Sequence, residues 1–336
     1  MPNSPDNSIR GGVYLSDVSP RDTKLDHKRA KVDRVRDLYH EGGENRLSDR
    51  LNFCARFLNF AVLDDNGVTK YKLDSAMFCH VRLCPFCQFL NSRMWTRRFL
   101  ASLPDILEDY PAARFLFLTL TVKNCHVDSL NSTIKHLNKS WDRLTHYKDF
   151  RHVLGYVKTL EVTRELKKNG LGEIIGFTDY AHPHFHVILM VSSTYFKGNN
   201  YLSHKDWLAM WQKAARLDYE PSVNIKAVKP KPNTPDGQHP IYKAVLEVLK
   251  YSVKDSDLLT DSDYLVKLTN QLRHVRSKSL GGVFKEYLSE DQLNNPTDEQ
   301  MIHDSEEAKE LLKDKPHVLA AWREYVKRYQ IIDPVD

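Results

Sequence analysis

The sequence has 336 residues, with 49 lysines and arginines against 44 aspartates and glutamates, so its formal net charge is +5. With 41% hydrophobic residues the chain is a folded protein of about two domains, which excludes an intrinsically disordered protein. No apolar run reaches the ~18 residues of a membrane span, and the polar start MPNSPDNSIRGG predicts no secretory signal.

The first fifty residues are polar and charged. The stretch SPRDTKLDHKRAKVDRVRDLYHEGG (19–43) predicts at most one solvated helix, without an apolar face wide enough to bury much. We therefore expect residues 1–50 to form a mobile or loosely packed N-terminal arm.

Residues 51–107 form a cysteine-rich, basic region. Three thiols at C-x4-C-P-x-C spacing converge readily on one ion, and a fourth lies twenty-five residues upstream. Four thiolates are the usual ligands of a structural zinc ion, and here they are Cys54, Cys79, Cys84 and Cys87. His80 is an alternative fourth ligand, although it adjoins Cys79 and would point away. The other interpretation is a set of reduced cysteines in a helix hairpin.

The odd number of cysteines, five, does not predict a disulfide framework. A reducing, cytoplasmic compartment is the expected location. The fifth cysteine, Cys125, directly follows a predicted strand and is expected to be a buried free thiol.

The run SRMWTRRFL (92–100) combines positive charge with aromatic rings. This combination suits contact with a DNA backbone and its bases, and the candidate DNA-binding residues are Arg93, Arg97 and Arg98. Equally, Trp95 and Phe99 fit the buried face of a helix, and the sequence leaves both interpretations open.

Residues 108–260 alternate between strand and helix patterns. Strands are predicted at 114–124, 154–163, 184–191 and 223–230, and helices at 128–147, 203–217 and 240–254. The order β-α-β-β-α-β-α is that of a split βαβ, ferredoxin-like domain. The expected fold class is therefore α+β, with an antiparallel sheet in this domain. A mostly helical region is expected over 261–336.

Side chains alternate across a strand, so in HPHFHVILMV (182–191) His184 and His186 share one face, opposite Phe185. Glu161 lies on the polar face of the preceding predicted strand. Two imidazoles and one carboxylate make a three-ligand metal site with open positions. Mixed oxygen and nitrogen ligation favours Mn²⁺ or Mg²⁺ over a closed zinc site. The simpler alternatives are surface histidines and a surface carboxylate.

In EVLKYSVK (247–254), Glu247, Tyr251 and Lys254 have spacings of four and three, which place them on one face of the predicted helix. A tyrosine there could attack a phosphodiester, a glutamate could activate water, and a lysine could hold a phosphate. An ordinary charged helix surface would show the same spacing.

The three segments FLFLTLTVKN, HPHFHVILMV and EVLKYSVKDSD, in this order, resemble the three motifs of HUH endonucleases. The similarity is to the rolling-circle replication initiators (Rep proteins) of small plasmids of Gram-positive type, in the subgroup with one tyrosine and a glutamate four residues before it. It extends from about Cys54 to Gly282 and includes the cysteine segment CHVRLCPFC.

The resemblance implies an HUH nuclease domain that nicks one strand of a plasmid double-strand origin. Tyr251 would stay attached to the 5′ phosphate, the free 3′-OH would prime synthesis, and Glu247 would direct water at termination. His184 and His186 would be metal ligands, and Glu161 matches the acidic ligand of related Reps. The implied partners are single-stranded DNA, a host UvrD-like helicase and a DNA polymerase. Alternatives are a relaxase or transposase of the same chemistry, or a non-catalytic zinc-containing DNA-binding regulator.

Overall fold

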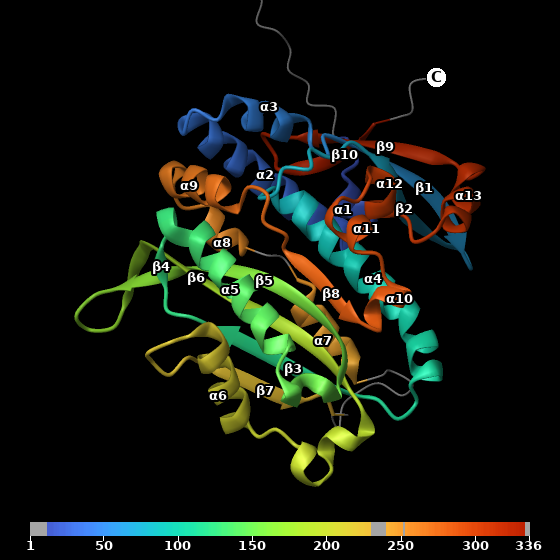
Figure 1. Cartoon of the computed structure of the whole chain (residues 1–336). Helices are drawn as coiled ribbons and strands as arrows, with labels where there is room; N and C mark the ends of the chain where they lie inside the picture. The colour runs from blue at the N-terminus through green and yellow to red at the C-terminus, as the bar shows by residue number, and fades with distance from the viewer. Residues whose placement is uncertain (1–11, 230–239, 251–252, 333–336) are drawn as a thin grey trace, which may run out of the picture.

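The computed structural model describes residues 12–229, 240–250 and 253–332 (Figure 1). It confirms the predicted α+β class, with helices packed around two antiparallel sheets. None of the helices in this part of the chain is long and apolar enough to cross a membrane.

The larger sheet has the strand order β7-β3-β6-β5-β8, and β4 pairs with β6 off this path. Its strands are β3 (Arg114–Thr121), β4 (Cys125–His126), β5 (Val153–Lys168), β6 (Ile174–Val191), β7 (Val223–Ala227) and β8 (Lys278–Gly282). The four predicted strands are all present, and β5 and β6 form one long hairpin at the centre of the sheet. Strand β8 was not predicted, and it is the edge strand beside β5.

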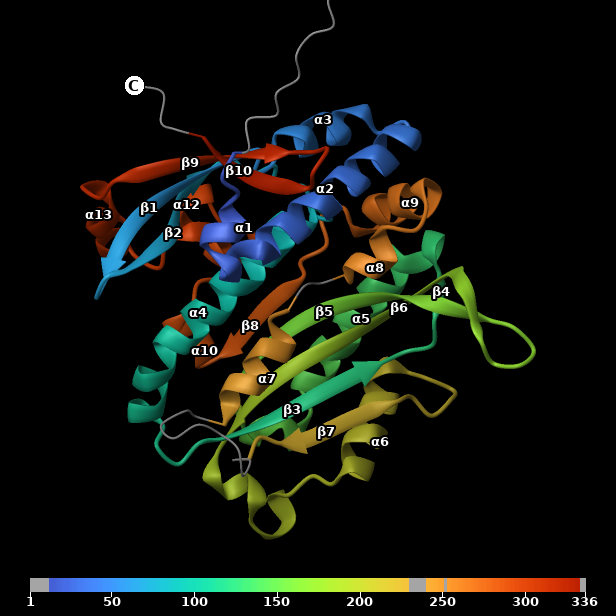
Figure 2. The ribbon, with the colours of Figure 1, turned by 180° about the vertical axis from the view of Figure 1, so that it is seen from behind.

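Helices cover both faces of this sheet, because its strands carry apolar side chains on both sides (Figure 2). On one face lie α5 (Leu130–Thr145) and α6 (His204–Ala215), which pack on Phe185 and its same-face neighbours. On the other face lie α4 (Pro85–Asp109) and α7 (Ile241–Val248), which pack on Ile188 and Met190. His184 and His186 have the parity of this second face.

The smaller sheet, of order β10-β9-β1-β2, joins segments from the two ends of the chain. Its strands are β1 (Phe57–Asp65), β2 (Val68–Ala76), β9 (His317–Arg323) and β10 (Arg328–Ile332). The predicted C-terminal helices exist, as α9 (Ser262–Leu272), α10 (Phe284–Tyr287), α11 (Glu290–Asn294), α12 (Asp298–Ile302) and α13 (Glu306–Lys313). The mostly helical prediction missed β8, β9 and β10, and residues 317–332 pack with the cysteine-rich region.

The expectation of a loosely packed N-terminal arm is wrong for residues 12–50. They form α1 (Leu15–Val18), α2 (Thr23–Glu41) and most of α3 (Asn45–Phe53). Helix α2 buries Val32, Val35 and Leu38 in the main core. It also buries Asp33, which accepts hydrogen bonds from Arg29 at 2.5 Å and from the Trp322 indole at 2.9 Å. Internal pairing of these charges lets a polar helix pack tightly.

Candidate metal and catalytic sites

The carboxylate of Glu161 and the imidazoles of His184 and His186 meet on one face of the β5–β6 hairpin. The strand register places Glu161 opposite His184. Glu161 Oε2 lies 2.7 Å from His186 Nε2 and 3.3 Å from His184 Nε2, and the two Nε2 atoms are 3.1 Å apart. All three residues are at least nine-tenths buried. The structure thus brings together the three predicted ligands around one point.

Hydrogen bonds on the far side of each ring orient the two imidazoles. His184 Nδ1 donates to the His182 carbonyl oxygen at 3.1 Å, and His186 Nδ1 lies 3.1 Å from the Thr119 hydroxyl. With Nδ1 engaged, Nε2 of each ring faces the site, as is usual for a metal-ligating histidine. The His182 ring instead bonds the Asn124 side chain at 2.6 Å, and His182 is not among the three clustered ligands.

The surroundings of Glu161 favour the ionised form of its carboxylate. Burial by itself would raise its pKa, but hydrogen bonds from His184 and His186 outweigh burial and hold the pKa well below its ordinary value. In the metal-free protein a proton must join Glu161 to His186 Nε2, and a cation would replace that proton. A buried carboxylate with two imidazoles fits a catalytic divalent cation.

A residue that the sequence analysis missed, Lys250, completes this cluster. Its ammonium lies 2.5 Å from Glu247 Oε1 and 3.4 Å from Glu161 Oε2. Burial lowers the pKa of Lys250, whereas the hydrogen bond to Glu247 and the charge of Glu161 raise it, and the net change is upward. Lys250 therefore links the predicted water-activating glutamate to the metal-ligand cluster. A glutamate and a lysine three residues apart are common on helix surfaces. Only the contact of Lys250 with Glu161 on β5 therefore marks this lysine as part of the site, and the sequence does not show that contact.

The predicted single helix over 240–254 is wrong. Helix α7 ends at Val248, and Val253 pairs with Val162 of β5 in a parallel bridge. Lys254 follows in an extended conformation as the N-cap of α8 (Asp255–Leu258), and its exposed side chain forms no ion pair with any described residue. It therefore does not share a helical face with Glu247. Tyr251 lies outside the described residues.

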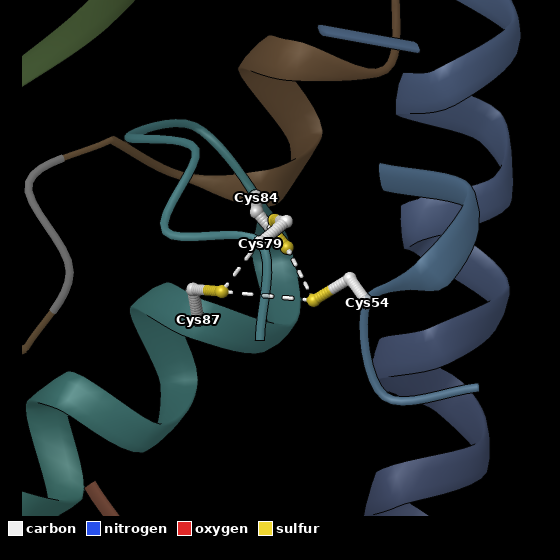
Figure 3. Close-up of side chains that lie close together, drawn as sticks. All are labelled: Cys54, Cys79, Cys84 and Cys87. Carbon is white, nitrogen blue, oxygen red and sulfur yellow. Dashed lines mark hydrogen bonds between the residues drawn. The ribbon is translucent and has the colours of Figure 1, made fainter. Parts of the chain in front are cut away.

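The four predicted zinc ligands also converge (Figure 3). They come from the end of α3, the loop after β2 and the first turn of α4, where Cys84 is the N-cap. The Sγ atoms of Cys54–Cys84 and Cys54–Cys87 are 3.6 Å apart, and those of Cys79–Cys87 are 3.7 Å apart. A tetrahedron with Zn–S bonds of about 2.3 Å places its sulfurs about 3.8 Å apart.

The chemistry of this cysteine cluster (Cys54, Cys79, Cys84 and Cys87) fits a bound cation. All four side chains are buried, and burial raises the pKa of the Cys84 thiol well above its ordinary value. Four neighbouring thiolates need a metal to offset their charge. His80 turns away and pairs with Asp298 at 2.5 Å, as expected. Cys125 is a half-buried free thiol outside the cluster.

The arginine-aromatic run of α4 separates into two parts. Trp95 and Phe99 are buried in the second core, so the packing interpretation holds for the rings. Arg97 pairs with Asp304 at 2.6 Å, and Arg98 donates to Gln292 at 3.2 Å. Arg93 is exposed, beside the Phe89 ring. DNA binding by these three arginines stays a prediction, and two of them hold the C-terminal region.

Comparison with known proteins agrees with this geometry. A family model described as replication protein matches residues 70–330. The chain belongs to this family of plasmid replication proteins. A protein rep of Streptococcus pneumoniae serotype 2 is 32% identical over 301 residues, which cover 88% of each chain. A protein rep of Lactiplantibacillus plantarum is 33% identical over 80% of this chain and 83% of its own.

Shorter Rep proteins are also similar. A replication protein of Staphylococcus aureus is 32% identical over 237 residues, which cover 68% of this chain and 94% of its own. The matched span includes both metal-ligand clusters except for Cys54, which precedes residue 70. No solved structure gives a significant match.

Proposed function

We propose that this Rep protein initiates rolling-circle replication by nicking one strand of its plasmid origin, with Tyr251 as the nucleophile. The supporting observation is the cluster of Glu161, His184 and His186. The described residues on either side of Tyr251 contact this cluster or its strand. Lys250 contacts Glu161, and Val253 pairs with Val162, the neighbour of Glu161.

The three-ligand cluster would hold Mn²⁺ or Mg²⁺, which when bound polarises a phosphate and offsets charge on its oxygens. The Tyr251 oxygen forms a bond to phosphorus, and the bond from phosphorus to the 3′ oxygen breaks. The Tyr251 hydroxyl gives up its proton and the leaving oxygen takes one up to become the 3′-OH primer, while the 5′ phosphate stays on the tyrosine. A polymerase then extends the primer, and a UvrD-like host helicase unwinds the parental strand.

Glu247 is proposed to act at termination. Its carboxylate is half-exposed and is held by Lys250 at 2.5 Å, on the helix that ends beside the metal ligands. A carboxylate in this place can take a proton from water, which then attacks the second phosphodiester. The bond from phosphorus to the 3′ oxygen breaks, and the 3′-OH so freed attacks the phosphodiester on Tyr251, which closes the strand and returns the proton to the leaving tyrosine oxygen.

The cysteine cluster is proposed to bind one structural zinc ion, which would join α3, the loop after β2 and α4. Because all four sulfurs are used, this site has no open position for chemistry. The two metal sites therefore have separate roles, and their loss should have different consequences.

Nicking and binding measured side by side test the catalytic assignment. The protein is incubated with Mn²⁺ and a supercoiled plasmid carrying the origin, and a gel shift on the origin duplex is run in parallel. His184→Ala and His186→Ala should abolish nicking and leave duplex binding intact. Full nicking by both variants would refute the assignment of His184 and His186 as metal ligands. A wild-type protein that binds the origin but never nicks it would favour a non-catalytic regulator.

A further inference from the structure

A positively charged cavity of about 680 Å³ lies between the loop of the cysteine cluster, α4 and the segment that leads into β8. None of Glu161, His184 and His186 lines it. Its lining includes the cationic side chains Arg82, Arg276 and Lys278, and it contains no aspartate or glutamate. The described wall of this cavity is therefore positively charged.

Two of these cations have no counter-ion among the described residues: Lys278 is buried, and Arg82 is partly buried. Lys278 is 7% exposed, and its ammonium lies 5.1 Å from the centre of the Trp95 ring. The Arg82 guanidinium donates through Nη1 to the Val275 carbonyl oxygen, but its Nε and Nη2 are buried and have no hydrogen-bond partner. In the described part of the chain neither residue forms an ion pair.

The surrounding carboxylates do not neutralise this pair. Glu290 lies 3.6 Å from Arg276, and Asp298 pairs with His80. Burial and the neighbouring charge of Arg82 lower the pKa of Lys278 to about 8. Two like charges in a buried place are unfavourable for folding alone, so an anionic ligand would explain why they lie together.

Another basic cavity adjoins this one at the segment that leads into β8. A neighbouring cavity of about 870 Å³, between α5 and the sheet, shares the lining from His274 to Lys278. It adds Lys135, Lys158 and Arg273, against one carboxylate, Asp142. Cations that line two adjoining cavities fit a polymeric anion better than a single free phosphate.

We propose that Arg82 and Lys278 bind a backbone phosphate of the origin DNA, at a site separate from the cutting site. A planar guanidinium with free N–H groups and an ammonium are the donors that phosphate oxygens require. This inference rests on the proposed function, because it takes origin DNA as the ligand.

The proposal gives the cysteine cluster a role in DNA binding. Arg82 lies between Cys79 and Cys84, so a zinc ion there would fix the loop that presents the guanidinium. Lys278 begins β8, whose partner β5 carries Glu161. A phosphate held at this site would position the DNA relative to the metal ligands on the same sheet.

The salt dependence of origin binding tests the site in the full-length, zinc-containing protein. Tyr251→Phe is introduced in every sample to prevent covalent attachment. Binding of a fluorescein-labelled origin duplex is followed by anisotropy between low and moderate salt. The double variant Arg82→Met/Lys278→Met should lower the slope of log K against log [salt] by about 0.9, the value of one phosphate contact on duplex DNA. The control Lys313→Met, an exposed residue paired with Glu310, should leave the slope unchanged.

A scan of the DNA keeps the test independent of folding defects. Single methylphosphonates, which are neutral, are placed along the origin and tested with the protein that keeps Arg82 and Lys278. One position should weaken binding to this protein and to Lys278→Arg, and should have no further effect on the double variant Arg82→Met/Lys278→Met.

The outcomes separate the proposals. An unchanged salt slope in a folded, zinc-containing double variant overturns the phosphate site, while nicking by the wild type still supports the function. Binding of inorganic phosphate that requires Lys278, with origin binding unaffected, overturns the DNA assignment. A wild-type protein that neither binds nor nicks the origin contradicts the proposed function itself.

Discussion

Replacing Cys84 by serine should remove the zinc ion and unfold the region around it. Cys84 is the N-cap of α4 and contributes one of four thiolates, with Cys54 Sγ 3.6 Å away. Leu83 and Phe86 beside it are fully buried, so the cluster is part of the packed core. A hydroxyl is a much poorer zinc ligand than a thiolate.

The magnitude follows from comparing two free energies. Structural zinc contributes about 10–16 kcal/mol in small metal-folded units, and a whole domain is stable by only about 5–15 kcal/mol. Loss of even a third of the zinc contribution is therefore comparable with the stability of the fold. We expect Cys84→Ser to lower the melting temperature strongly and to lower solubility, with less effect on nicking per folded molecule.

The assay combines metal analysis with calorimetry on protein purified without chelator. Wild type should contain one zinc per chain, and Cys84→Ser should contain none. Cys125→Ser is the matched control, because Cys125 is a half-buried thiol outside the cluster, and it should keep both the zinc and the melting temperature. Native protein without zinc, or a Cys84→Ser variant with unchanged zinc and melting temperature, would refute the assignment.

Three further predictions concern single side chains. Glu161→Ala should reduce Mn²⁺-dependent nicking strongly but less completely than the histidine variants, since water can replace one ligand; an unchanged Mn²⁺ dependence would place the third ligand elsewhere. Glu247→Ala should nick nearly normally and lose about 10²–10⁴-fold in release at the second origin of a two-origin plasmid; equal loss of both steps would exclude the termination role. Burial lowers the pKa of Lys158 to about 7, so the folded state sheds its proton first and stability should rise as pH increases from about 7 towards 10. Lys158→Met should make this rise in denaturant unfolding smaller, and the part that remains is expected from Lys278, whose pKa is lowered to about 8. A rise as large as that of the wild type would contradict the lowered pKa of Lys158.

The larger sheet was predictable because its signals are local. Alternation along 184–191 and the helical spacing of Leu130, Ile134 and Leu137 each lie within one element, and the structure buries these residues as expected. The convergence of Glu161 with the histidines followed from strand parity and adjacency, and the register of β5 on β6 bears it out.

The missed features depend on contacts between distant parts of the chain. Strand β1 pairs with β9, as in Phe57 with Ala321, and no local pattern reports such pairing. Helix α2 looks solvated because its charges dominate, but Arg29 and Asp33 neutralise each other inside the core. The helix expected to continue to 254 ends at Val248, since Val253 pairs with β5 instead. Lys250 was missed because its second partner, Glu161, lies on β5, far from it in the sequence.

The identity of the residue attached to DNA tests the central claim most directly. Wild-type protein is incubated with Mn²⁺ and the origin plasmid, digested with nuclease and protease, and analysed by mass spectrometry. We predict a single peptide that carries a 5′-nucleotide on Tyr251, absent from Tyr251→Phe and from His184→Ala, with the nick at one origin position. An adduct on another residue, or nicking by Tyr251→Phe at the wild-type rate, would contradict the account.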